Sequence, residues 1–189
     1  MQSRLNIHLA ALLLLASATF SAHAEEAVRD PETWQVESGG IQVRLTQITP
    51  NQARAFYQAR GFSSEQAEHY ANGCVFMTVV RNIGATPIQH NLSNWRYVTA
   101  DGQPRQIRSK AAWTRYWQRL GVLEPAQIAF TWAQFPAAQS FAAGDWNQGM
   151  THYALPRGAR FDLRFTWSES GKPRHGKLEN LRCADENQD

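Results

Sequence analysis

The sequence contains little cysteine and methionine, and it lacks several motifs that mark enzymes. Two cysteines and three methionines occur among 189 residues. No Cys-x-x-Cys pair is present, which disfavours thiol redox chemistry because that spacing often lowers a thiol pKa. A Gly-x-Ser-x-Gly elbow, a His-Glu-x-x-His helix and a phosphate-binding glycine loop are also missing. We therefore expect that the protein is not an enzyme.

Long apolar runs are scarce as well. The one sustained run, Leu9–Leu15, follows Arg4 and precedes the small-residue ending Ala22-His23-Ala24. This pattern is typical of a secretory signal peptide over residues 1–24, cleaved before Glu25. No second run approaches the roughly 20 residues that cross a bilayer, and no cysteine at the cleavage site could carry a lipid. We expect a soluble periplasmic protein without a transmembrane segment.

The two cysteines, Cys74 and Cys183, both follow the expected cleavage site. Because thiols in an exported protein are usually oxidised and no other pair exists, we expect one disulfide between them. Residues 25–39 form a polar leader, and 40–189 have a length that suits a single domain with a full core.

Cap and stop residues predict three short helices. Thr49-Pro50 with Gly61 predicts one near 50–60, and Ser63 with Gln66 predicts a second at 63–72. A third, at 110–120, follows Ser109 and ends before a glycine.

Strand patterns fill most of the remaining chain. The alternation in Ile41–Leu45 predicts a strand near 40–48, and Cys74–Val80 is rich in β-forming residues. Turn residues separate the further strand candidates. These candidates are Ile88–Leu92, Trp95–Thr99, Gln127–Trp132, Thr151–Leu155, Phe161–Trp167 and Lys177–Cys183. Their spacing predicts a mainly β fold, an antiparallel sandwich with short helical insertions.

Part of this pattern resembles a known class of domain. Val79–Ile88, followed by Tyr97–Gly102, is similar to the early strands of bacterial immunoglobulin-like periplasmic accessory domains. Tyr153–Gly158, followed by Phe161–Phe165, is similar to their late strands. The resemblance covers about residues 74–183. It implies an immunoglobulin-like sandwich and a binding or assembly scaffold more often than an enzyme, and it transfers no functional residue.

The interval 102–123 contains five basic residues and no acidic one. Helical spacing places Trp113 and Trp117 in one stripe, and Arg115 and Arg119 point away from that stripe. The stripe either covers the sheet, with solvated arginines, or forms a docking surface for an acidic protein, since aromatic residues and arginine are enriched at hot spots. Export and a net charge of only +3 argue against nucleic acid. The partner-binding candidates are Arg108, Trp113, Arg115, Trp117 and Arg119, with Asp145 and Trp146 from a neighbouring loop.

Two alternative functions remain open beside ordinary core roles for the same residues. Met150 and His152 would share a strand face, and a thioether with an imidazole suits copper, with His90 and Met77 as further ligands. The second alternative is a carbohydrate-binding module that stacks sugars on exposed tryptophans. The tryptophans considered for that role are Trp34, Trp95, Trp132 and Trp167.

Overall fold

The computed structural model describes residues 31–185. The expected signal peptide, residues 1–24, and the first part of the polar leader lie outside this range. Within 31–185, no helix is both long and apolar enough to cross a membrane.

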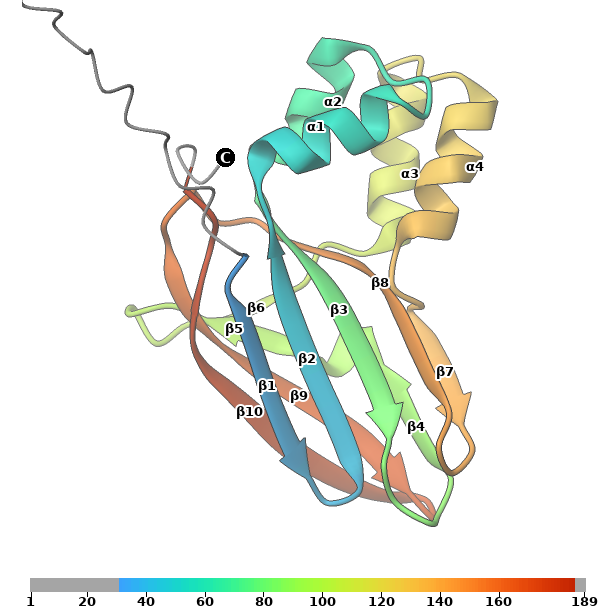
Figure 1. Cartoon of the computed structure of the whole chain (residues 1–189), viewed down its shortest axis with the longest axis vertical. Helices are drawn as coiled ribbons and strands as arrows, with labels where there is room; N and C mark the ends of the chain where they lie inside the picture. Colours follow the sequence, from blue (N-terminus) through green and yellow to red (C-terminus); the bar gives the residue numbers. More distant parts are fainter. Residues whose placement is uncertain (1–30, 186–189) are drawn as a thin grey trace, which may run out of the picture.

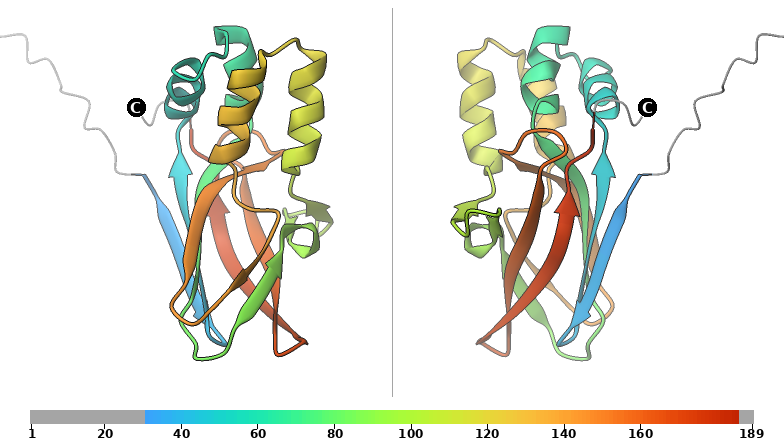
Figure 2. Two further views of the ribbon diagram at one scale, coloured as in Figure 1. Left: turned by 90° about the vertical axis from the view of Figure 1, so that its right-hand side faces the viewer. Right: turned by 90° about the vertical axis from the view of Figure 1, so that its left-hand side faces the viewer.

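Two antiparallel sheets face each other as layers (Figures 1 and 2). Sheet A has the order β1-β2-β3-β8, with β1 (Thr33–Ser38), β2 (Ile41–Ile48), β3 (Cys74–Asn82) and β8 (Trp146–Tyr153). Sheet B has the order β6-β5-β9-β4-β7, and β10 also pairs with β9. Its strands are β4 (Ile88–Asn91), β5 (Arg96–Val98), β6 (Pro104–Gln106), β7 (Ala138–Phe141), β9 (Arg160–Glu169) and β10 (Lys172–Arg182). A 3₁₀ turn, η1 (Leu92–Asn94), joins β4 to β5. The predicted mainly β, antiparallel architecture is confirmed.

The main core lies between the sheets. Alternate residues of β2, such as Val43 and Leu45, are fully buried, and so are Leu163 and Phe165 of β9. This period of two is what a strand with one buried face requires. Cys74 at the start of β3 and Cys183 just after β10 form the predicted disulfide, with their Cα atoms 5.1 Å apart. It therefore ties sheet A to sheet B.

Four helices gather at one end of the sandwich (Figures 1 and 2). They are α1 (Pro50–Gln58), α2 (Ser64–Ala71), α3 (Lys110–Arg119) and α4 (Glu124–Ala133). The α1–α2 hairpin connects β2 to β3, and the α3–α4 hairpin connects β6 to β7. Ser63 forms the predicted capping box, the predicted cap Thr49 forms a capping box with Gln52 as well, and Ser109 caps α3. The three predicted helices are confirmed.

A second, aromatic core joins the helices to the outer face of sheet A. Tyr57, Tyr70, Trp113, Trp117 and Phe130 are fully buried there. Val75 of β3 and Met150 of β8 belong to the same cluster. The helical end is therefore part of the folded body rather than an appendage.

The first helix of each hairpin ends in the same short sequence pattern. It consists of an aromatic residue, glutamine, two further residues and glycine. In each, the glycine has a positive φ, 89° at Gly61 and 64° at Gly121. The next amide, of Phe62 or Val122, donates to the carbonyl of a buried aromatic residue five positions earlier. This is the bond of a Schellman helix end, and glycine suits it because it carries no Cβ.

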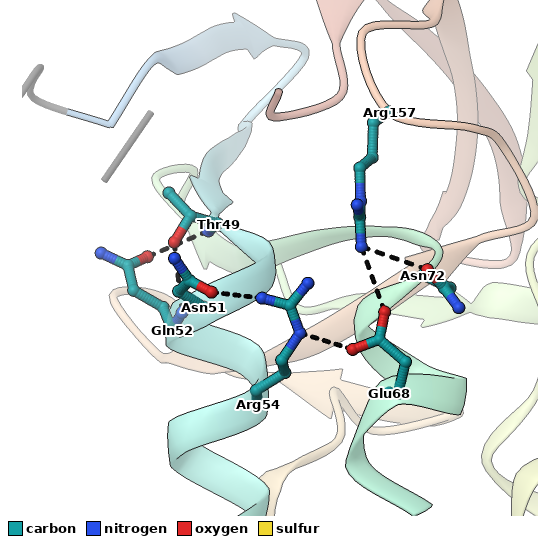
Figure 3. A network of polar contacts seen from close by, with 7 residues as sticks. All are labelled: Thr49, Asn51, Gln52, Arg54, Glu68, Asn72 and Arg157. Carbon is teal, nitrogen blue, oxygen red and sulfur yellow. Dashed lines mark hydrogen bonds and ion pairs between the residues drawn. The ribbon is translucent and has the colours of Figure 1, made fainter. Parts of the chain in front are cut away.

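A charged contact links the first hairpin to the sandwich (Figure 3). Glu68 of α2 lies between Arg54 of α1 and Arg157 from the loop after β8. Nη2 of Arg157 donates to Glu68 Oε1 at 3.2 Å and to Asn72 Oδ1 at 3.1 Å. One carboxylate thus connects both helices of the hairpin to the β framework.

One strand prediction is wrong: Gln127–Trp132 belongs to α4. Its apolar and β-branched residues suggest a strand, but Ala126 and Phe130, one helical turn apart, are the buried pair. Pro125 at the helix start also suits α4.

Three strands were not predicted: β1, within the expected leader, and the short strands β6 and β7. The strand expected at Thr151–Leu155 is the end of β8, which begins at Trp146.

Candidate docking face on helices α3 and α4

The two tryptophans proposed as partner contacts on α3 are interior residues. Trp113 and Trp117 are fully buried and stack with their ring centroids 4.9 Å apart. Trp117 also meets Phe62 and Phe130 edge-on, at 5.2 and 5.5 Å between centroids. The prediction that they contact a partner is therefore wrong for this fold, because their stripe closes the aromatic core.

The arginines near these tryptophans occupy different environments. Arg108 is half-buried, and its guanidinium carbon lies 3.7 Å from the centroid of the Trp113 ring and 4.9 Å from that of Tyr116. Burial lowers the Arg108 pKa. Arg115 and Arg119 are exposed on the same helix, and Arg119 approaches Tyr116 at 5.7 Å. Arg108 thus covers the aromatic core, whereas the other two face solvent.

Helix α4 exposes large apolar side chains on the side opposite its buried face. Ala126 and Phe130 are buried, while Trp132 is 85% exposed, Ile128 51% and Leu123, at the N-cap, 71%. Positions 128 and 132 are one turn apart and so share a face. The exposed apolar strip that these two side chains form is typical of an interaction site.

A groove of about 370 Å³ lies between the helices beside this strip. It is lined by Thr114 of α3 and by Gln127, Ile128, Thr131 and Trp132 of α4, with Glu124 at the helix start. The Thr114 hydroxyl donates to the carbonyl of Lys110 at 3.1 Å, and that of Thr131 to the carbonyl of Gln127 at 2.9 Å. Because both hydroxyls bond within their own helices, the groove offers mainly apolar contact.

We call the exposed surface made by Arg115, Ile128 and Trp132 the α3–α4 face; Arg119, beside Tyr116, is a further exposed cation of α3. Arg115 follows Thr114 directly, so at 100° per residue it lies at the solvent side of the groove. Since α3 carries no acidic residue, its side of the groove is positively charged, whereas Glu124 of α4 adds one carboxylate to the lining. Sequence reasoning found the arginines but missed the role of α4, whose apolar residues resembled a strand. The exposed strip could have been found from Ile128 and Trp132 only if α4 had been recognised as a helix.

The loop candidates do not join this face. Asp145 and Trp146 are exposed, and Asp145 Oδ2 accepts from the amide of Ala142 at 2.8 Å. Trp146 begins β8 opposite Arg81 of β3, at the end of the sandwich away from the helices (Figure 1). The prediction of a loop neighbouring α3 is wrong, because β7 leads the chain away from α4 before the loop.

The structure brings together three of the four proposed copper ligands. Met77 and Met150 are directly opposite in register, and His152 lies two residues along β8 from Met150. His90 belongs to β4 of the other sheet, where its ring contacts Phe135 and Phe141 at centroid distances of 5.1 and 5.6 Å. Within 31–185, no group of three or more His, Cys, Asp or Glu side chains could hold a metal.

Met150 belongs to a buried polar chain instead. The Tyr57 hydroxyl donates to its sulfur at 3.3 Å, and Gln134 Nε2 donates to the same hydroxyl at 2.8 Å. The Tyr70 hydroxyl donates to Gln134 Oε1 at 3.0 Å. Burial raises the pKa of both tyrosines, so they remain protonated donors. This chain satisfies polar groups that would otherwise be costly to bury.

Burial keeps two histidines neutral. Burial, together with the nearby positive charge of Arg108, lowers the pKa of His152 to about 3, although the backbone of His152 itself and of Tyr70 acts in the opposite direction. Burial also lowers the pKa of His90 to about 4.

The four tryptophans considered for sugar stacking lie apart. Trp95 and Trp167 are buried in the main core. Trp34 is half-buried on β1, where it meets Phe76 edge-on at 5.9 Å between centroids. Trp132 is the one with a widely exposed ring, so these four residues do not form a shared platform.

Comparisons with protein families and curated proteins found no relative of this chain, since no protein-family model and no curated protein matches it. Among solved structures, it is similar to the YjhA protein of Bacillus subtilis at 10% sequence identity, with 69% of this chain and 76% of that chain covered and a TM-score of 0.40. A similarity of this size carries no argument about function.

Proposed function

We propose that the protein is an exported, non-enzymatic binding or assembly protein that contacts an acidic protein partner through the α3–α4 face. The observation that carries this proposal is Trp132, 85% exposed and in line with Ile128 on a helix whose other face is buried. Exposing an indole to water forgoes about 25 cal/mol per Å² of apolar surface. Tryptophan is also among the residues that most often dominate binding energy.

The charge beside the strip indicates the chemistry of the partner. Arg115 and Arg119 are exposed, and α3 offers no carboxylate to neutralise them. A complementary segment therefore carries apolar anchors for the groove and carboxylates for the arginines. Ile128 and Trp132 lie about 6 Å apart along α4 at 1.5 Å per residue and line the same groove, which suits an apolar protein segment that enters the groove.

The compartment and the finer fold class belong to the same proposal. The pattern of Arg4, Leu9–Leu15 and Ala22-His23-Ala24 supports export to the periplasm. Two antiparallel sheets around one core, together with the strand and turn pattern of 74–183, support an immunoglobulin-like accessory domain. The two helical hairpins would be additions to a plain sandwich of that class.

Site-specific photo-crosslinking in the producing cell tests the proposal. A crosslinker at Ile128 should give one discrete protein adduct that is absent with the crosslinker at the exposed Glu179 of β10. Reversing charge at Arg115 and Arg119 should remove the adduct and leave the folded chain intact. No adduct, or the same adduct from both positions, would refute a specific docking face.

Affinity measurements on the identified partner complete this test. Trp132→Ala should weaken binding at least tenfold, a loss of about 1.4 kcal/mol. Trp146→Ala is the matched control, since it removes another exposed tryptophan at the other end of the sandwich. Binding of the chain to phosphatidylglycerol vesicles that is lost in Trp132→Ala, without a protein adduct, would replace the protein partner by a lipid surface.

A further inference from the structure

A row of cationic side chains crosses the outer face of sheet B. Lys177 of β10 is directly opposite Arg164 of β9, which in turn is directly opposite Arg96 of β5. Leu163 and Phe165 point into the core, so Arg164 between them points outward. Neighbouring strands are about 4.8 Å apart, which places three positive charges across about 10 Å. Like charges directly opposite destabilise a sheet, so the fold alone does not account for this row.

The row lines a groove on the surface, which we call the sheet-B groove. Its volume is about 690 Å³, within the range of about 300–1,000 Å³ typical of small-molecule sites. Thr166, Asn94 and His175 add polar groups to its lining. Phe165 lines it from beneath but is fully buried, so the groove provides charge and hydrogen bonding rather than an aromatic platform.

The central arginine has unused hydrogen-bonding capacity. The Arg164 side chain is exposed and forms no hydrogen bond or ion pair with any residue of 31–185, although its charge acts on Asp162, two residues away on β9. Lys177, by contrast, lies 3.0 Å from Asp162 and 2.7 Å from Glu179. Arg96 donates to the backbone carbonyls of Ser93 and Trp95, which carry no net charge to offset its own.

The acidic residue in the groove lining is Glu37 of β1. Its Oε1 accepts a hydrogen bond from Gln42 at 2.7 Å, and it forms no ion pair with the row within the described residues. Arg164 and Arg96 thus form no ion pair within 31–185, and an external anion would compete with the nearby carboxylates of Glu37 and Asp162 for their charge.

We propose that the sheet-B groove binds a small ligand with two or more oxyanion groups, carboxylates or phosphates. Arg164 and Arg96 hold the oxyanions through their planar guanidinium groups, which match both chemistries with paired hydrogen bonds. Lys177 adds charge at the edge of the row. This site is separate from the α3–α4 face and does not depend on the partner proposed there.

Isothermal titration of the mature chain at low ionic strength tests the groove, with citrate and tripolyphosphate as probes. At least one probe should bind with saturable one-to-one stoichiometry, and acetate should not. Arg164→Gln and Arg96→Gln should each weaken binding about tenfold or more. Stronger binding of citrate would assign a carboxylate ligand, and stronger binding of tripolyphosphate a phosphate ligand.

Arg174→Gln is the matched control, because it removes the same charge from an exposed arginine that pairs with Glu169 and does not line the groove. The affinity of the Arg174→Gln variant for the probe should equal that of the unmodified chain. Arg164→Gln should keep or raise the Tm, since it relieves repulsion within the row. Absence of saturable binding, or equal weakening by Arg174→Gln, would overturn the proposal.

Discussion

At the scale of single residues, the interior contains imidazoles that the protein keeps uncharged. Neither ring nitrogen of His90 has a hydrogen-bond partner, and its ring lies among Trp95, Phe135 and Phe141. The folded-state pKa of about 4 lies below the value of about 6.5 expected in an unfolded chain. The unfolded state therefore binds the proton first, and stability present above pH 6.5 is lost as the pH falls toward 4.

We predict that His90→Phe makes stability less sensitive to acid. Between about pH 6.5 and 4, the loss of unfolding free energy per pH unit should be smaller than in the unmodified chain by up to about 1.4 kcal/mol, because one proton no longer enters on unfolding. Urea unfolding at a series of pH values measures this slope. Gln89→Ala, at an exposed position of the same strand, serves as control and should keep the original slope. An unchanged slope in His90→Phe would contradict the assignment.

Gly73 shows a residue whose role depends on a distant neighbour. Its position after α2 suggests a glycine helix stop, but its φ is not positive, so it forms no left-handed cap. A Cβ there would lie 1.9 Å from Nε2 of His152, so the glycine makes room for the buried imidazole. This role follows only from the packing of β8 against the helices.

At the scale of elements, the quality of the N-cap separates the helices that were predicted from the one that was missed. Thr49, Ser63 and Ser109 each accept a backbone amide hydrogen bond at the start of their helix. The N-cap of α4 is Leu123, which makes no such bond. Without a cap signal, the apolar residues of α4 resemble a strand, and only their burial shows the helical period.

This difference predicts that Leu123→Ser stabilises α4. A serine oxygen can accept an amide hydrogen bond that leucine cannot, and such caps contribute about 1 kcal/mol. Leu123→Ala is the matched control because it removes the same exposed apolar side chain without adding an acceptor. In denaturant unfolding, the serine variant should be more stable than the alanine variant by about 0.5–1 kcal/mol. Equal stability would show that this helix start does not use the cap.

At the scale of the whole molecule, the disulfide closes a loop that contains more than two thirds of the described chain. Cys74 and Cys183 are 109 residues apart and connect the two sheets. Closing so long a loop lowers the conformational entropy of the unfolded chain. In the chain-entropy model this raises the free energy of the unfolded state by about 4.7 kcal/mol for a loop of roughly 100 residues. The link therefore acts mainly on the unfolded state.

We predict that Cys74→Ala/Cys183→Ala lowers the free energy of unfolding by about 2–5 kcal/mol. Non-reducing urea unfolding of the variant and of the oxidised chain measures the difference. Reducing the unmodified chain should produce a similar loss, while the same reductant should not change the variant. A loss below about 1 kcal/mol would contradict a major role for the link.

The sequence by itself determined the features that depend on neighbouring residues, namely helix ends and strands. It also determined the cysteine pairing, because the sequence contains no other pair. Capping residues and turn glycines predicted α1, α2 and α3. Alternation predicted β2, and runs of β-forming residues bounded by turn residues predicted most of the other long strands. The two cysteines of the sequence predicted their own pairing. These signals are local, so they survive without knowledge of the fold. The copper and docking candidates were chosen by residue type, which does not reveal burial.

Only the tertiary structure decided which faces remain available. It turned Trp113 inward and Trp132 outward, although both belong to the same helical hairpin. It also aligned Arg96, Arg164 and Lys177, which come from separate strands, in one row. Strand register and helix orientation arise from long-range pairing that minimises exposed apolar area, and no short stretch of sequence contains that information.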